Sequence, residues 1–284
     1  IISEKLGNVE DILSISFVGS FLNKKNFSDI DIVIITKNIS RNIIKRCHKE
    51  INEINFKSCG VNKKILINDT FGPLKFNTKK NLVFHLMIYS YDDHIKHVIN
   101  SPFTCYDWER TQASYGFNLK DIYPVMKIFT SDFFFKNRGI DIYRKNLINK
   151  KINYKKYFFR NNQVQIRQLD YKITGKDIYE FCYHVISFTC KNYLKYILQI
   201  NKNFRTKEII NFYSKLFKED ESKKMVQFYR SLLNFKKKQK INFNQKESIK
   251  NTLNFLKQFE LKIKEQEKNS IKLNFKRHFK TKYN

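Results

Sequence analysis

The chain has 284 residues, of which 42% are hydrophobic, and its 55 basic and 26 acidic residues give a formal net charge of +29. Only seven glycines and three prolines occur, which argues against long linkers and a disordered chain. No apolar run approaches the roughly 18 residues of a membrane-spanning helix, so no membrane partner is expected. The charge attracts polyanions, but lysine, asparagine and isoleucine dominate the whole chain, so nucleic acid is an alternative partner that charge alone does not favour.

The length is sufficient for about two domains. The five cysteines form no Cys-x-x-Cys pair, which is typical of reduced thiols and not of a disulfide framework or a zinc knuckle. The start shows no signal-peptide pattern, and we therefore expect a cytoplasmic protein. The first residue is Ile1 and not methionine, and residues 280–284 complete no predicted element, so truncation at either end is kept as an open alternative.

A short strand containing Ile15, Phe17 and Val18 is predicted after the end of a helix within residues 1–12, and it stops at Gly19-Ser20. Glycine lets a phosphate approach the backbone amides without a Cβ in the way. The serine hydroxyl can donate a hydrogen bond to the same anion. We therefore predict that Gly19 and Ser20 bind the phosphates of a nucleotide.

The next strand begins with two carboxylates. Asp29 and Asp31 precede a run of β-branched apolar residues that ends at Ile35. Positions i and i+2 of a strand lie on one face, about 6–7 Å apart, while the residue between them faces the core. Carboxylates this close repel each other unless a cation lies between them, and such an oxygen pair suits Mg²⁺. We therefore predict a divalent metal site at Asp29 and Asp31.

The chain thus has a strand, Gly19-Ser20, a short loop and then Asp29 and Asp31 at the start of a hydrophobic strand. At these four residues it resembles the DNA polymerase beta-like nucleotidyltransferase superfamily. The resemblance covers about residues 11–40. It implies a domain with a mixed sheet, Mg²⁺ (or Mn²⁺) held by Asp29 and Asp31, and a nucleoside triphosphate bound at Gly19 and Ser20.

Three further elements of this domain are expected. Ser40 is a predicted N-cap of a helix over about 41–55, whose apolar residues share one face. Two strands follow near 64–67 and 81–89, with turn-like residues between them. The second strand is apolar apart from His85 and is predicted to be a buried central strand.

The superfamily pattern asks for a third acid on such a strand, and His85 stands at the matching position. Three carboxylates would hold two Mg²⁺ ions, whereas a neutral imidazole suits softer metals better. His85 is therefore interpreted as a ligand of a metal such as Mn²⁺, as the base for an acceptor hydroxyl, as the mark of a non-catalytic domain, or as a core histidine bonded to a backbone carbonyl. Asp69 is the reserve candidate for the third acid.

A helix is expected over 92–100, with His94 and His97 at i and i+3. This spacing is compatible with a metal site, but no third ligand follows in order, so a solvated face is expected. Residues 101–110 are expected to form a loop that contains the single tryptophan, Trp108. Trp108 either takes part in binding a ligand or anchors the loop by packing.

The second half of the chain has mainly helical periodicity. Residues 119–150 are predicted to be helical, and the basic and aromatic stretch 151–168 is predicted to be a hairpin or linker that can stack on a nucleotide. Helices are expected at about 176–200, 206–218, 221–237 and 245–267, which suggests a bundle. The expected fold class is α+β: a nucleotidyltransferase-like domain (1–115), a connecting helical and basic-aromatic segment (116–170), and an all-α helical bundle (171–284).

The favoured function is a metal-dependent nucleotidyltransferase that moves a nucleoside monophosphate from a triphosphate to a hydroxyl acceptor. Asp29, Asp31 and His85 are the predicted catalytic residues, and the sequence does not select the acceptor. The alternative is a catalytically degenerate binding or regulatory protein, similar to antitoxins of the same superfamily. A third interpretation, an RNA-directed transferase, rests on charge alone.

Overall fold

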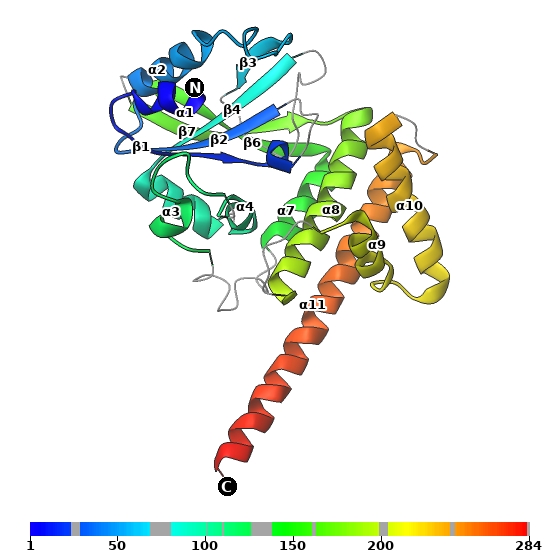
Figure 1. Ribbon diagram of the computed structural model, residues 1–284. Coiled ribbons are helices and arrows are strands. Elements are labelled where there is room, and N and C mark those ends of the chain that lie inside the picture. Colours follow the sequence, from blue (N-terminus) through cyan, green and yellow to red (C-terminus); the bar gives the residue numbers. More distant parts are fainter. Residues whose placement is uncertain are drawn as a thin grey trace. The chain divides into compact units, whose positions relative to one another are not determined.

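The computed structural model describes residues 1–23, 29–68, 81–100, 102–109, 111–125, 138–160, 163–198, 204–238 and 242–282 (Figure 1). The chain forms two compact units. Unit 1 contains Ile1–Thr130 and Asn153–Asp170, and unit 2 contains Ser131–Ile152 and Tyr171–Asn284. The chain therefore passes between the units three times, after residues 130, 152 and 170.

Unit 1 is built on a five-stranded mixed sheet with the order β3-β4-β2-β1-β5. β4 is parallel to both β2 and β3, whereas β1 is antiparallel to both β2 and β5. The strands span Ile12–Val18 (β1), Asp29–Thr36 (β2), Lys64–Asn68 (β3), Asn81–Ser90 (β4) and Tyr115–Gly116 (β5). The expected mixed sheet is thus confirmed.

Helices cover both faces of this sheet (Figure 1). One face carries α1 (Ile2–Gly7) and α2 (Arg41–Asn52), and the other carries α3 (Tyr91–Asn100) and α4 (Pro102–Trp108). Alternate residues of β2 and β4 join α1 and α2 in one hydrophobic core, which includes Ile30, Ile32, Ile34, Phe84, Leu86 and Ile88. Each fully buried side chain of this kind stabilises the fold by about 1.5–3 kcal/mol. The other alternate residues, including Asp29, Asp31 and His85, consequently belong to the face of α3 and α4.

The N-terminus of α2 is capped as predicted, because the Ser40 hydroxyl accepts a hydrogen bond from the backbone N–H of Ile43 at 3.2 Å. The prediction of a loop at 101–110 is wrong for most of this stretch, since Pro102–Trp108 is helical. Proline is favoured in the first helical turn, and burial of Cys105 and Trp108 at i and i+3 gives α4 an apolar face. Trp108, only 7% exposed, is therefore a packing anchor.

A two-stranded hairpin, β6 (Lys151–Arg160) and β7 (Gln163–Lys172), follows the first segment of unit 2. From β6, the buried Tyr157 reaches the outer edge of β4, which β3 pairs only as far as His85. The Tyr157 hydroxyl accepts a hydrogen bond from the N–H of Ile88 at 2.7 Å and donates one to its C=O at 2.5 Å. One side chain thus satisfies backbone groups that a further strand would otherwise pair.

Unit 2 is helical in its described part, apart from the outer ends of the hairpin strands, and this confirms the expected C-terminal helical region. Tyr213, Tyr229, Phe255 and Phe259 are among its largest fully buried side chains. Its helices are α7 (Arg138–Asn149), α8 (Lys176–Leu198), α9 (Thr206–Ser214), α10 (Glu219–Lys238) and α11 (Gln245–Lys282). Within the described residues of the whole chain, no helix has both the length and the apolar character needed to cross a membrane.

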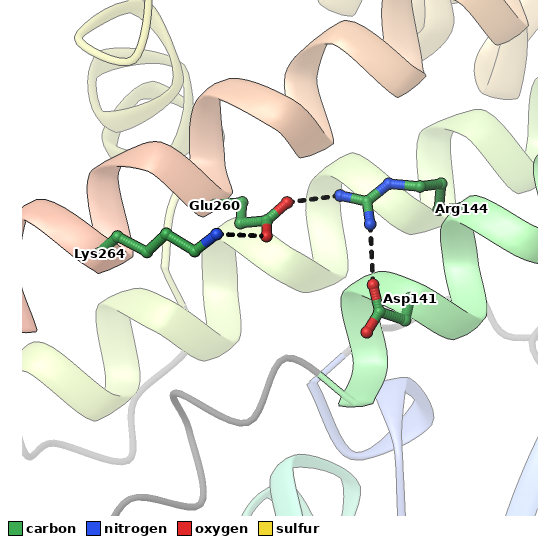
Figure 2. A network of polar contacts seen from close by, with 4 residues as sticks. All are labelled: Asp141, Arg144, Glu260 and Lys264. Carbon is green, nitrogen blue, oxygen red and sulfur yellow. Dashed lines mark hydrogen bonds and ion pairs between the residues drawn. The ribbon is translucent and has the colours of Figure 1, made fainter.

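An ion-pair network links α7 to α11 within unit 2 (Figure 2). Arg144 donates to Oε2 of Glu260 at 2.6 Å and to Oδ1 of Asp141 at 2.8 Å. Lys264 lies 3.0 Å from the other oxygen of Glu260. The hydrogen bond from Lys264, followed by Arg144, lowers the pKa of Glu260, so this carboxylate is charged at neutral pH.

Three histidines, the buried His94 and the partly buried His97 and His184, make the fold sensitive to acid. Burial, together with Lys236 and Lys191, lowers the pKa of His184 in α8 to about 4, and burial lowers the pKa of His94 to about 4. Burial, then Lys155 and His94, lowers the pKa of His97 to about 3. Below pH 6.5 these histidines bind protons in the unfolded chain but stay neutral in the folded chain. Each histidine therefore lowers the free energy of unfolding by about 1.4 kcal/mol per pH unit as the pH falls towards 4.

Urea unfolding followed by circular dichroism between pH 7 and pH 4.5 measures this loss. Replacing His184 with phenylalanine is expected to reduce the pH dependence, because phenylalanine takes up no proton. The new ring should fit, since the ring of His184 already stacks on Phe188 with centroids 5.1 Å apart. The same pH dependence in wild type and His184→Phe would contradict the prediction for His184.

Candidate functional site

Asp31 lies at the centre of a row of residues that crosses the sheet. It pairs with Val18 of β1 on one side and with His85 of β4 on the other. Asp29 precedes it by two residues on the same strand and therefore on the same face. The antiparallel pairing of β1 with β2 and the parallel pairing of β2 with β4 thus bring together residues from distant parts of the sequence.

The side chains of Asp29, Asp31 and His85 converge on this face. Each offers one potential ligand atom, and these three atoms lie within 4.8 Å of one another. Around an octahedral ion with bonds of about 2.1 Å, adjacent ligand atoms lie about 3.0 Å apart and opposite ones about 4.2 Å apart. Small side-chain rotations would therefore let all three residues contact one cation.

Exposure differs among the three residues. His85 is 6% exposed, whereas Asp29 and Asp31 are partly exposed. A ligand can therefore reach the carboxylates from solvent, while the imidazole forms the buried side of the group. Two carboxylates provide the hard oxygen ligands that Mg²⁺ and Mn²⁺ accept, and the imidazole favours Mn²⁺ over Mg²⁺.

Gly19 lies directly against this group at the end of β1. Its φ of +91° belongs to the left-handed region, which glycine adopts readily and other residues avoid. A Cβ added at this position would overlap Oδ2 of Asp31. The absence of a side chain at Gly19 therefore permits both the backbone turn and the position of the Asp31 carboxylate.

Replacing Gly19 with alanine is expected to destabilise the protein and to displace Asp31. The positive φ costs about 1–2 kcal/mol, and the overlap adds about 1–3 kcal/mol. Gly60→Ala is a matched control, because Gly60 has φ +77° but an added Cβ there meets no atom within 4 Å. Thermal unfolding should show a larger loss for Gly19→Ala than for Gly60→Ala, and equal losses would contradict the close approach to Asp31.

Two other predicted positions are only partly described. The backbone at Ser20 begins the 3₁₀ helix η1 (Ser20–Asn23), while the role of its hydroxyl stays a prediction. Asp69, the reserve candidate for the third acid, lies outside the described residues. Among the described residues, Asp29, Asp31 and His85 form the only group of three or more acidic, histidine or cysteine side chains placed to share a metal ion.

Asn68 is a neighbour of this group that the sequence did not indicate. It is the last residue of β3 and pairs with His85, which places both side chains on the same face of the sheet. The sequence placed Asn68 in a turn, because Asn-Asp-Thr is typical turn chemistry. Only the parallel register of β3 and β4 reveals its position.

The structure also corrects the prediction for His94 and His97. His94 is 1% exposed, and the ring of His97 stacks on Tyr89 with centroids 5.1 Å apart. Trp108 lies against His97 at 5.2 Å. These two aromatic side chains from β4 and α4 cover α3, so the expected solvated face is instead part of the packing of unit 1.

Comparison with known protein families, curated proteins and solved structures found no match to this chain.

Proposed function

We propose that this protein is a metal-dependent nucleotidyltransferase. The observation that supports the proposal is the convergence of the Asp29, Asp31 and His85 ligand atoms within 4.8 Å of one another. Gly19 lies against the same group, as expected for a turn that admits phosphates. The resemblance of this motif to the polymerase beta-like superfamily points in the same direction, including the helical region that follows the sheet.

Each residue has a defined role in this proposal. Asp29 and Asp31 hold the divalent cation, and the turn at Gly19 and Ser20 receives the triphosphate. When bound, Mg²⁺ or Mn²⁺ neutralises charge on the triphosphate and on the leaving pyrophosphate. The oxygen of an acceptor hydroxyl forms a bond to the α-phosphorus while the bond to the pyrophosphate breaks. His85 either completes the ligand set or accepts the proton of the acceptor hydroxyl.

The second candidate function is a catalytically degenerate member of the same superfamily with a binding or regulatory role. The observation that favours it is the imidazole of His85 at the position adjacent to Asp31. Two carboxylates kept on one face argue for the enzyme, because without a cation they repel each other.

Binding of a labelled nucleoside triphosphate with and without Mn²⁺ or Mg²⁺ tests the proposal directly. We expect binding that requires the cation, together with transfer of the labelled monophosphate to one of a panel of hydroxyl acceptors. Metal-dependent binding without transfer to any acceptor would favour the binding or regulatory protein. Triphosphate binding that is unchanged in metal-free buffer would contradict the metal-dependent enzyme.

A further inference from the structure

A cavity of about 300 Å³ lies in unit 1 between α3 and the β6–β7 hairpin. Its position follows from the fold: Tyr89 closes it from the end of β4, His97 from α3, and Lys155 and Gln168 from the hairpin. Tyr89 is four residues beyond His85, a distance of about 13 Å along a strand. The cavity is therefore separate from the carboxylate group.

Three polar side chains at this cavity have no partner within the described parts of the chain. Lys155 and Gln168 make neither an ion pair nor a hydrogen bond with any described residue. Nδ1 of His97 is buried and likewise has no described hydrogen-bond partner. Water can still solvate the half-buried Lys155 and the exposed Gln168. The buried Nδ1 of His97 cannot be solvated in this way, and a buried polar atom without a partner costs about 1–3 kcal/mol, so its position at this cavity suggests a ligand.

The charge around the cavity indicates what kind of ligand fits. Asp93 is already compensated, since the Ser90 hydroxyl donates to it at 2.8 Å and the Lys96 ammonium lies 3.8 Å away. Lys155 forms no ion pair with any described acidic residue. Its positive charge lies near enough to His97 to lower the pKa of that imidazole. His97 is therefore neutral at pH 7, and together with Gln168 it can offer uncharged donors beside one cation.

We propose that this cavity binds a small molecule through an oxyanion, either a phosphate or a carboxylate group. Lys155 compensates the charge, and His97 and Gln168 donate hydrogen bonds to the oxygens. Ile166 supplies an apolar wall for the rest of the molecule. A cavity of about 300 Å³ is at the small end of ligand sites, so the molecule is a small one. The proposal does not depend on the nucleotidyltransferase activity.

The only tryptophan of the chain provides the reporter for a test. Trp108 lies 5.2 Å from the ring of His97, so occupation of the cavity should change its fluorescence. The intact protein is titrated with inorganic phosphate and, separately, with acetate, in metal-free buffer at constant ionic strength set by chloride. We expect a saturable change with at least one of them: phosphate alone indicates a phosphorylated ligand, and acetate alone a carboxylic acid.

Lys155→Met should weaken this binding about tenfold or more, because a charge-assisted interaction is lost while the aliphatic stem is kept. Lys156→Met is the matched control, since it removes the same charge from the next residue, which is exposed and does not line the cavity. Gln168→Leu, at an exposed position, should also weaken binding and covers the case in which Lys155→Met does not fold. Equal weakening by Lys155→Met and Lys156→Met, or no saturable signal with either anion, would overturn the proposal.

Discussion

Replacing Asp31 with asparagine is expected to abolish metal-dependent triphosphate binding while leaving the melting temperature equal or higher. Asp31 occupies the centre of the row between Val18 and His85, so its carboxylate contributes to any shared cation. Changes outside the ligand shell already reduce metal affinity by about 10- to 100-fold, and loss of a ligand should exceed that. Without a cation, removing one of two adjacent negative charges relieves repulsion and stabilises the fold.

Calorimetric titration with Mn²⁺ and a nucleoside triphosphate, beside thermal unfolding, measures both effects. Asp92→Asn is the control, because it changes the net charge equally at an exposed position of α3, away from the carboxylate pair. A large fall in melting temperature with unchanged nucleotide binding would show that Asp31 has a structural role and would remove it from the proposed site.

Replacing His85 separates the enzyme from the degenerate protein. If the imidazole completes the ligand set or accepts a proton, His85→Ala should lower nucleotidyl transfer by about tenfold or more. His85→Asp should keep or raise Mg²⁺-dependent transfer, because a third carboxylate restores the superfamily pattern. The third carboxylate also adds repulsion within the group, so His85→Asp should melt lower than wild type without metal and gain more stability when metal is added.

The measurement is transfer from labelled triphosphates by wild type, His85→Ala and His85→Asp, with melting curves in the presence and absence of Mg²⁺. Equal transfer by all three would exclude His85 from the mechanism. Transfer by His85→Asp alone would identify the natural protein as a silenced transferase, and the binding or regulatory function would then replace the first proposal.

The geometry of the carboxylate pair was predictable because it depends on local pattern. Alternation along one strand was enough to put Asp29 and Asp31 on a common face and the isoleucines of β2 in the core. Helical periodicity likewise anticipated α8 to α11, although α11 continues to Lys282.

The neighbours of the pair were harder to predict, because they depend on contacts between distant segments. His85 was identified only through resemblance, and Asn68 was not identified at all, since parallel register leaves no local trace in a sequence. His94 and His97 were misplaced because their burial is caused by Tyr89 and Trp108, which belong to other elements. The cavity between α3 and the hairpin was likewise not predictable, because it is lined by segments that are distant in the sequence.

The hairpin is the element whose place in the fold was hardest to predict from the sequence. β6 mixes basic and aromatic residues without a regular alternation, and β7 has only a short alternation of apolar residues at Val164 and Ile166, so the sequence gives little indication of a buried face. The sequence placed residues 116–170 in a connecting segment, whereas the structure groups Asn153–Asp170 with unit 1. The reason is a contact over 69 positions, from the Tyr157 hydroxyl to the backbone of Ile88.

This contact has a consequence for the order in which the protein can fold as it is synthesised. The segment that protects Ile88 leaves the ribosome only after the first part of unit 2, Ser131–Ile152. At about 5–20 residues per second, the interval between Thr130 and Asp170 lasts roughly 2–8 s. During that time the nascent sheet presents an unprotected edge at β4 to other chains, and truncation before residue 153 would make this exposure permanent.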